Sequence, residues 1–178
     1  MTDQELIDGC LDKKSDCEKL LYERLSPVLY GVCLRYARNQ MEAEDIMQDG
    51  FIKIYAKLHT FKHEGSFEGW CRRIMVNTAI KYFKKGSNKN EFSNLEDVKE
   101  ERFESKAIGK ISERELLDLI DELPHGYKTV FNLHAIEGYR HTEIAEMLGV
   151  TESTSRTQFY KARKVLKSAL QKMQLILI

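Results

Sequence analysis

The chain has 178 residues, of which 42% are hydrophobic and 31% charged, and its 28 Lys and Arg balance its 28 Asp and Glu. This apolar content can bury a core in one domain or in two small ones. No apolar run approaches the roughly 20 residues that span a bilayer, and the N-terminus has no signal-peptide pattern, so we expect a cytoplasmic protein without membrane insertion. With only two prolines and no run of alternating Val, Ile and Thr, the sequence predicts an all-α fold.

The zero net charge conceals two cationic zones that an acidic strip separates. Residues 72–90 contain six Lys and Arg and no acid, whereas acids dominate residues 91–121. Residues 151–178 are basic again, with Glu152 as their only acid. This distribution along the chain is more informative than the net charge.

Helical periodicity begins with a short helix over residues 2–12 and continues in a longer one that runs to about Arg38. Ser15 is the expected N-cap of the longer helix, and Glu18, three residues later, completes a capping box. Pro27 is expected to kink this helix, because proline removes a backbone hydrogen bond. Its expected buried face consists of Leu20, Leu21, Leu25, Val28, Leu29, Val32, Cys33 and Tyr36.

A further helix is expected from Met41 to Leu58, with Asn39 as its N-cap. Its first two turns carry Glu42, Glu44, Asp45, Gln48 and Asp49. Acids at this position suit the positive end of the helix dipole, and they equally suit an acidic docking face for a basic partner. The residues alone leave both interpretations open.

A loop from Thr60 to Ser66 leads into a helix from Phe67 to Lys85 whose polar side is basic. Such a helix suits single-stranded nucleic acid, because aromatic rings stack on unpaired bases while cations follow phosphates. Trp70 is expected in the core, so Phe61 and His63 in the loop are the better candidates for contacting a base. The polar side consists of Arg72, Arg73, Asn77, Lys81, Lys84 and Lys85.

Residues 87–110 are polar and acidic and cannot support a core of their own, so we expect a linker there. In the region that follows, a short helix over Thr142–Leu148 precedes a longer one that starts after Thr151, its expected N-cap. Gly149 between them is expected to end the first helix in the left-handed conformation. This spacing predicts a helix-turn-helix.

The second helix of this pair has one apolar and one cationic stripe. A cationic second helix is the shape that enters a DNA major groove. DNA binding is favoured over a merely solvated basic face, because the turn spacing, the inward aliphatic residues and the one-sided charge coincide. The inward stripe is Ser155, Phe159, Ala162, Leu166, Ala169 and Leu170, and the outward stripe is Ser153, Arg156, Thr157, Tyr160, Lys161 and Lys164.

The cysteines form no C-x-x-C pair and fall within helical patterns, at Cys10, Cys17, Cys33 and Cys71. Buried free thiols in a reducing cytosol are the simplest account of them. A zinc site that uses His59 or His63 is the alternative.

Three sequence runs follow one another in a particular order. Residues 43–55 are AEDIMQDGFIKIY, and residues 67–77 are FEGWCRRIMVN. The third run extends from Leu123-Pro124 through Glu137-Gly138-Tyr139 and EIAEMLGV to Ala162-Arg163. Together they resemble the extracytoplasmic-function (ECF) sigma factors of bacterial RNA polymerase, in their core-binding segment, −10 segment and −35-binding domain.

The resemblance implies roles for individual residues. Asp45, Gln48 and Asp49 match positions that dock on the clamp helices of the largest polymerase subunit. The loop with Phe61 and His63 matches the one that captures a flipped base of the −10 element. The helix along that element is matched by Arg72, Arg73, Asn77 and Lys81, which Lys84 and Lys85 extend. The recognition helix for the −35 element is matched by Ser153, Arg156, Thr157, Lys161 and Lys164, with Tyr160 on the same stripe.

The implied protein is not an enzyme and needs no cofactor or metal. Its expected parts are a core- and −10-binding domain (1–86), an acidic linker (87–110) and a −35-binding domain (111–178). Its expected partners are the polymerase core, promoter DNA and an anti-sigma factor. Two positions depart from the family pattern, since Arg140 stands where many members have a capping serine and Ser155 where many have an inward valine.

Two other classes of protein are considered. A one-component transcription regulator would have N-terminal helices that sense a ligand and dimerise, which leaves the acidic face at residues 45–49 and the basic helix at residues 72–85 unexplained. A small helical enzyme would need a constellation of carboxylates or histidines, and the five histidines lie in unrelated settings.

Overall fold

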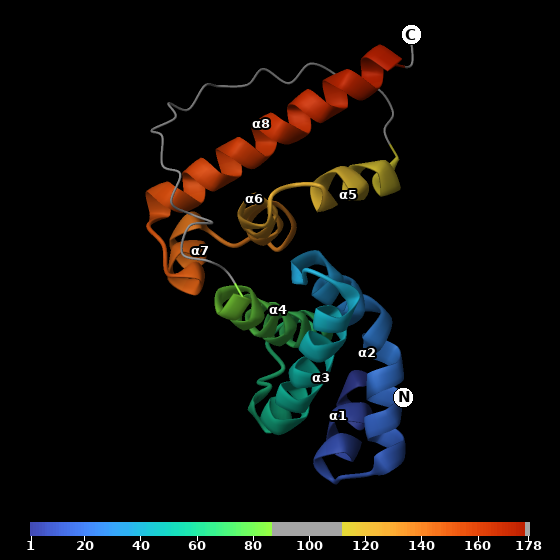
Figure 1. Ribbon diagram of the computed structural model, residues 1–178. Helices are drawn as coiled ribbons and strands as arrows, with labels where there is room; N and C mark the ends of the chain where they lie inside the picture. The colour runs from blue at the N-terminus through green and yellow to red at the C-terminus, as the bar shows by residue number, and fades with distance from the viewer. Residues whose placement is uncertain (87–111, 177–178) are drawn as a thin grey trace. The chain divides into compact units, whose positions relative to one another are not determined.

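The computed structural model describes residues 1–86 and 112–176, and every regular element in these ranges is a helix or helical turn. The all-α fold predicted from the sequence is therefore confirmed. The chain divides into two compact units at Gly86 (Figure 1). The predicted acidic linker, residues 87–110, lies outside the described residues.

The first unit is a helical bundle. Its helices are α1 (Asp3–Leu11), α2 (Ser15–Tyr36), α3 (Gln40–Lys57) and α4 (Phe67–Gly86), with a 3-10 turn, η1 (Leu58–Thr60), after α3. Helices α2, α3 and α4 pack on one another pairwise, and α1 packs on α2. The core includes the fully buried side chains of Leu6, Ile7, Leu21, Leu29, Tyr36, Ile46, Ile54, Met75 and Phe83.

Side-chain caps fix where α3 and α4 begin. The Asn39 side-chain oxygen accepts a hydrogen bond from the Glu42 backbone N–H at 2.9 Å, and Ser66 Oγ accepts one from the Gly69 N–H, also at 2.9 Å. The predicted Asn39 cap is confirmed, and Ser66 caps α4 in the same way. The predicted Ser15 cap is wrong, because the chain turns through a positive φ of 57° at Lys13 and Cys17 N–H already bonds to the Lys14 carbonyl. The helix therefore starts at Ser15 itself.

The predicted buried face of α2 is also too wide. Leu20 and Val28 are 38% and 39% exposed, whereas Leu21, Leu25 and Leu29 are buried. Periodicity locates the centre of a helix's apolar stripe, but the width that is buried depends on how many neighbours cover it. Here α3 and α4 leave the margins of α2 in solvent.

Gly50 allows α3 and α4 to approach closely. A Cβ at this position would overlap Sδ and Cε of Met75, a side chain on α4 with no solvent exposure. We therefore expect Gly50→Ala to destabilise the first unit by about 1–3 kcal/mol, as overpacked cores do. Trp70 is the only tryptophan and lies in this unit, so denaturant unfolding followed by its fluorescence measures the loss.

Gly31, inside α2, is the matched control for Gly50. A Cβ there meets no heavy atom within 4 Å. Since alanine is the better helix former, we expect Gly31→Ala to stabilise the unit by about 0.5–1 kcal/mol. Equal effects of the two substitutions would contradict the close approach at Gly50.

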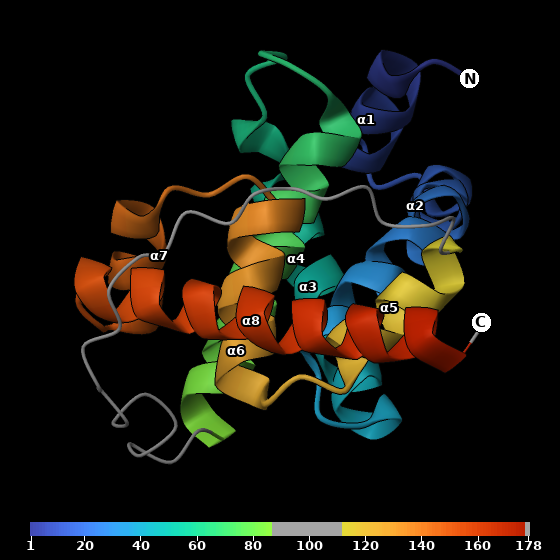
Figure 2. The ribbon, with the colours of Figure 1, turned by 90° about the horizontal axis from the view of Figure 1, so that it is seen from above.

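The second unit is built on one long helix, α8 (Glu152–Ile176). Helices α5 (Glu113–Asp121), α6 (His125–Phe131) and α7 (His141–Leu148) pack against it, and a π-helical turn, η3 (Asn132–Ile136), follows α6 (Figures 1 and 2). The buried Lys128 places Nζ 2.8 Å from Asp121 Oδ1, which ties α6 to the end of α5. The apolar cluster on α8 consists of Ile120, Leu123, Ala162 and Leu166, with Leu116, Leu119, Tyr127 and Phe131 packed against it.

The turn between α7 and α8 has the geometry that the sequence predicts. Gly149 has a φ of 72° and donates its N–H to the Ala145 carbonyl at 2.8 Å. Thr151 Oγ1 accepts a hydrogen bond from the Thr154 N–H at 3.0 Å and so caps α8. Helices α7 and α8 therefore form the predicted helix-turn-helix.

Candidate functional site

The exposed face of α3 carries Asp45 and Gln48, whereas Asp49 is half-buried. The Tyr82 hydroxyl on α4 donates a hydrogen bond to Asp49 Oδ2 at 2.8 Å. Burial, together with this hydrogen bond and the negative charge of Asp49, raises the pKa of Tyr82 to about 12, so the phenol remains protonated and donates. Asp49 thus joins α3 to α4, and Asp45 and Gln48 are the predicted docking residues that face solvent.

Two exposed apolar side chains flank this polar pair. Met41 is 74% exposed and Ile52 is 66% exposed. The four residues Met41, Asp45, Gln48 and Ile52 are spaced by four, three and four positions, which places them on one face of α3. Met41 and Ile52 are not among the residues predicted for this surface, although both stand outside the apolar stripe of α3 that packs inward.

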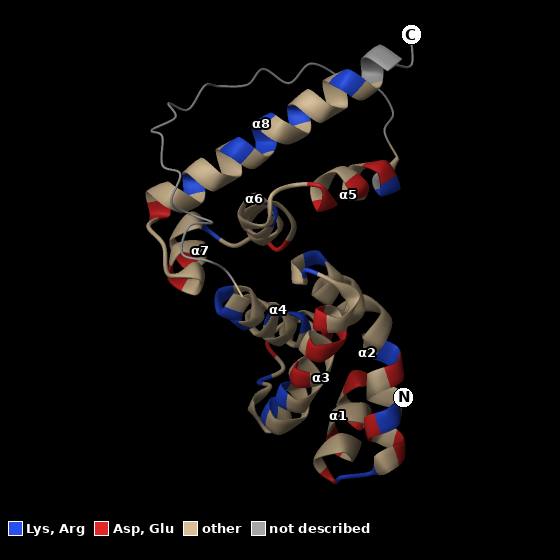
Figure 3. Cartoon of the chain, viewed as in Figure 1, with Lys and Arg blue, Asp and Glu red and all other residues tan. Residues whose placement is uncertain are grey.

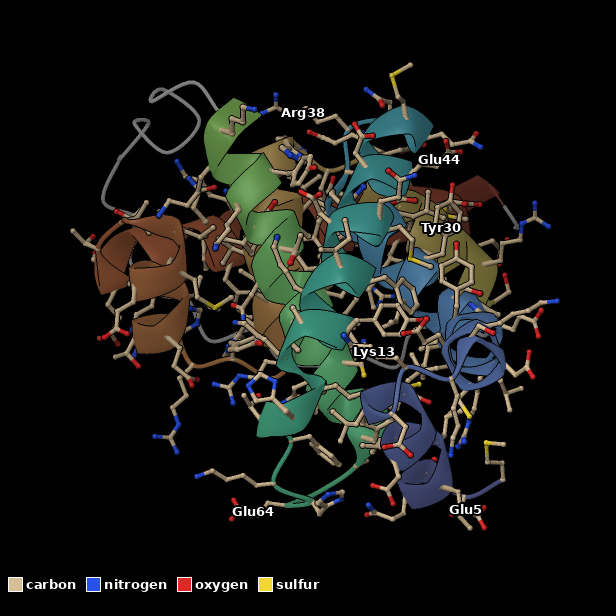
Figure 4. The ribbon with its side chains drawn as sticks, turned by 90° about the horizontal axis from the view of Figure 1, so that it is seen from below. Glu5, Lys13, Tyr30, Arg38, Glu44 and Glu64 are labelled. Carbon is tan, nitrogen blue, oxygen red and sulfur yellow. The ribbon has the colours of Figure 1, made fainter. Side chains whose placement is uncertain are left out.

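An open hollow of about 430 Å³ lies beside this face, between α2 and α3. Tyr30 of α2 and Glu44 of α3 lie on its rim, on the same side of the unit (Figure 4). Gln48 lines the hollow and also belongs to the exposed face of α3, so the two surfaces are continuous. The remaining lining residues are Tyr22, Ser26, Pro27 and Met47.

The loop between η1 and α4 is organised by an aromatic cluster. The ring centroid of Phe61 lies 5.3 Å from that of Phe67, 5.5 Å from that of Trp70 and 4.8 Å from that of His63. Phe61 and Trp70 are half-buried, while His63 is exposed and has a φ of 58°. Trp70 therefore belongs to the packed cluster and is also partly accessible to solvent.

The predicted polar residues of α4, which are cationic except for Asn77, divide into two groups. Arg73, Asn77, Lys81, Lys84 and Lys85 are exposed and follow one another at spacings of three or four, or directly in the case of Lys85. These spacings keep them on one stripe of the helix. Arg72 is half-buried and lies off this stripe, so it is set apart from the other candidate DNA contacts.

The predicted outward stripe of α8 faces away from the core of its unit. Ser153, Arg156 and Lys164 are exposed, and Thr157, Tyr160 and Lys161 are half-buried, whereas Ser155, Ala162 and Leu166 on the other side are buried. Basic residues recur along α8, and its one acid stands at its beginning (Figure 3). This arrangement suits contact with a polyanion.

The expectation that the histidines lie in unrelated settings is wrong for His134 and His141, which meet where η3 packs on α7. The rings of His134 and His141 stack with centroids 4.1 Å apart, and His134 Nδ1 lies 2.8 Å from the Tyr139 carbonyl oxygen. His141 Nδ1 lies 2.9 Å from Oγ of Ser155, which has no solvent exposure. A hydrogen bond between α7 and α8 thus accommodates Ser155, at a position where many members of the family that the sequence resembles have an inward valine.

Within residues 1–86 and 112–176, no group of three or more His, Cys, Asp and Glu is placed to hold a metal ion. Cys10, Cys17, Cys33 and Cys71 are free and buried. Burial raises the pKa of Cys33 and of Cys71 to about 12, which disfavours the reactive thiolate. The described helices include none that is long and apolar enough to cross a membrane.

Comparison with known proteins gives the family. Residues 21–89 match Sigma-70 region 2, and residues 113–166 match Sigma-70 region 4. The RNA polymerase sigma factor SigV of Bacillus subtilis is 30% identical over 149 residues, which cover 82% of this chain and 86% of SigV. The chain belongs to the ECF sigma factors of the sigma-70 family. The ECF sigma-E factor of Haemophilus influenzae is 28% identical to this sigma factor and aligns with 96% of it.

Solved structures agree with this sigma factor in fold. RpoE of Bartonella quintana, in complex with the anti-sigma factor NepR, superposes with a TM-score of 0.50 at 19% identity, over 86% of this chain and 96% of RpoE. CnrH, in complex with the cytosolic domain of CnrY, gives a TM-score of 0.52 at 18% identity, over 96% of this chain and 97% of CnrH.

Family membership confirms the predicted resemblance and the sigma-factor interpretation. The alternative of a one-component regulator assigned a sensing role to the N-terminal helices, and those helices match Sigma-70 region 2 instead. The matched regions belong to transcription initiation factors rather than to an enzyme family.

Proposed function

We propose that this sigma factor binds the polymerase core through the exposed face of α3, with Asp45 and Gln48 on the clamp helices of the largest subunit. Exposed Met41 and Ile52 would add apolar contacts at either end of this pair. Asp49 contributes by holding α3 on α4 through Tyr82. The observation that carries the proposal is the contrast between two neighbouring helices of the first unit. Helix α3 exposes an acidic residue and an amide, Asp45 and Gln48, whereas α4 exposes cations.

Promoter contacts are assigned to the two cationic helices. The stripe of α4 would follow the phosphates of the opened −10 element while His63 and Phe61 meet an unpaired base. Helix α8 would enter the major groove of the −35 element, where its cations contact phosphates and Arg156 or Lys161 contacts a guanine. The unit up to Gly86 would therefore serve the core and −10 element, and the unit from residue 111 onward the −35 element.

Run-off transcription on a genomic promoter library tests this function. Purified core polymerase is assayed with and without the sigma factor, and we expect defined start sites only when it is present. If the sigma factor never co-purifies with core polymerase and adds no start-site selectivity, the proposed function is wrong.

We also propose an anti-sigma factor as a partner, acting in the cytoplasm where the polymerase is. Support comes from two structural relatives that were each solved in a complex, RpoE with the anti-sigma factor NepR and CnrH with a domain of CnrY. An anti-sigma factor that covers α3 would compete with core polymerase. Adding core polymerase should therefore release it, and simultaneous binding of both would contradict this placement.

Arg156→Ala is expected to weaken −35 recognition by about 1–3 kcal/mol, the usual value of a bidentate guanine contact. The measurement is the affinity of the sigma factor–polymerase complex for duplexes that carry the selected −35 sequence or a single base change. Lys172→Ala is the matched control, since Lys172 is an exposed cation near the far end of the same helix. Equal loss of sequence preference in both variants would contradict a specific role for Arg156.

A further inference from the structure

Glu152 stands in the first turn of α8 and contacts Arg156, one of the two candidate guanine-binding residues. Its Oε1 accepts hydrogen bonds from Arg156 Nη2 at 2.6 Å and from Arg156 Nε at 3.0 Å. The two side chains are 42% and 53% exposed, so both remain accessible to a partner. Glu152 is also the only acid from Thr151 to the end of the chain.

The contact fixes which edge of the guanidinium stays available. A guanidinium has five N–H groups, and Glu152 engages one on Nε and one on Nη2. Three donors remain, two on Nη1 and one on Nη2. The terminal pair of nitrogens matches the O6 and N7 acceptors of guanine in the major groove. Glu152 therefore holds the inner edge of Arg156 and leaves its outer edge for a base.

Stability accounts only in part for an acid at this position, because the attraction of an exposed carboxylate to the positive end of the helix dipole is modest. An exposed Glu–Arg pair four residues apart stabilises a helix only slightly. An acid at a helix that contacts phosphates also weakens the attraction to DNA at every sequence, because affinity depends on the cations that neutralise phosphates. A benefit confined to the correct base would offset that general loss.

We propose that Glu152 is a positioning residue for −35 specificity, which holds the Arg156 guanidinium in the orientation that recognises guanine and disfavours its swing toward phosphate. This inference rests on the proposed function of α8. Glu152 acts through Arg156, and it lowers non-specific affinity while raising the preference for one base.

The experiment uses the full chain with core polymerase. Duplexes are first selected from a pool randomised across the −35 element, and Arg156→Ala identifies the base pair whose preference it removes. Affinities for all four bases at that pair are then measured for the wild type and for Glu152→Ala. Glu146→Ala is the control, because it removes one exposed acid from α7, on the other side of the turn.

We expect the wild type to prefer guanine at that pair by about 5- to 150-fold, the span of one bidentate contact. Glu152→Ala should bind the other duplexes more tightly while its guanine preference falls to about threefold or less. Glu146→Ala should keep the preference. The double variant Glu152→Ala/Arg156→Ala should show the same base preference as Arg156→Ala, because Glu152 affects the base preference only through Arg156.

Failures of the two proposals are distinguishable. If the wild type selects no sequence from the pool in the presence of core polymerase, the proposed function of α8 is wrong. If it does select one, but Glu152→Ala binds all four duplexes more tightly by the same factor, Glu152 contributes only its charge and the positioning role is refuted. If Arg156→Ala keeps the wild-type preference at every base pair, the positioning role of Glu152 is refuted as well.

Discussion

Asp45→Lys is expected to weaken binding to core polymerase by at least about 100-fold, because opposing like charges at an interface cost several kcal/mol. The effect should fall on association and not on folding, since the Asp45 side chain is exposed. Asp49 would be a poorer choice, because reversing its charge also breaks the hydrogen bond from Tyr82. The measurement is the dissociation constant for fluorescently labelled sigma factor and core polymerase.

Asp12→Lys provides the charge-matched control for Asp45→Lys. Asp12 is exposed and caps the C-terminus of α1, where a cation is tolerated by the helix dipole. We expect this variant to bind core polymerase like the wild type. Trp70 fluorescence and circular dichroism should be unchanged in both variants. The neutral Asp45→Asn should lose less affinity than Asp45→Lys, and unaltered binding by all three would exclude Asp45 from the interface.

The fold was largely predictable, because helical periodicity and capping are local. The Asn39 cap and the Gly149 stop each depend on a few neighbouring residues, and both are confirmed. The predicted Ser15 cap is wrong because the turn at Lys13 sets the helix start through the backbone rather than through a side chain. The predicted burial of Leu20 and Val28 is wrong because their exposure depends on helices distant in sequence.

The positions of the candidate surfaces could be predicted from the sequence, but the hydrogen bonds that join their residues to other helices could not. Charge patterning along α3, α4 and α8 locates the exposed polar residues, since each helix shows its own outward face. The bond between Asp49 and Tyr82 joins residues 33 positions apart, and no local pattern marks it. The pair of His141 and Ser155 likewise becomes visible only when α7 and α8 are packed together.

The pair of Glu152 and Arg156 could be predicted in part. An i, i+4 spacing of Glu and Arg can be found in the sequence, and it ordinarily indicates an exposed helix-stabilising pair. What the spacing does not give is the edge of the guanidinium that the carboxylate engages. That geometry distinguishes an ordinary surface pair from one that orients a DNA contact.

The triple variant Arg73→Ala/Lys81→Ala/Lys85→Ala is expected to slow promoter opening by at least about tenfold. These residues are exposed on one stripe of α4, and single-stranded DNA contributes a salt slope of about 0.7 per neutralised phosphate. The log–log dependence of opening on salt should therefore lose about 2 from its slope. A fluorescent base analogue in the −10 element measures opening across a salt series. Binding of the −35 duplex should persist, because α8 is unchanged.

The matched control for that variant removes three exposed cations from elsewhere in the same unit, Lys13, Lys14 and Lys19. The ion pairs of Lys14 with Asp12 and of Lys19 with Glu23 are exposed, so the fold should tolerate their loss. This control changes the net charge of the unit equally, and we expect it to leave the salt slope and opening rate nearly unchanged. If the two triple variants lower the salt slope by the same amount, promoter opening depends on overall charge. The proposed contact of the α4 stripe with the −10 strand is then wrong.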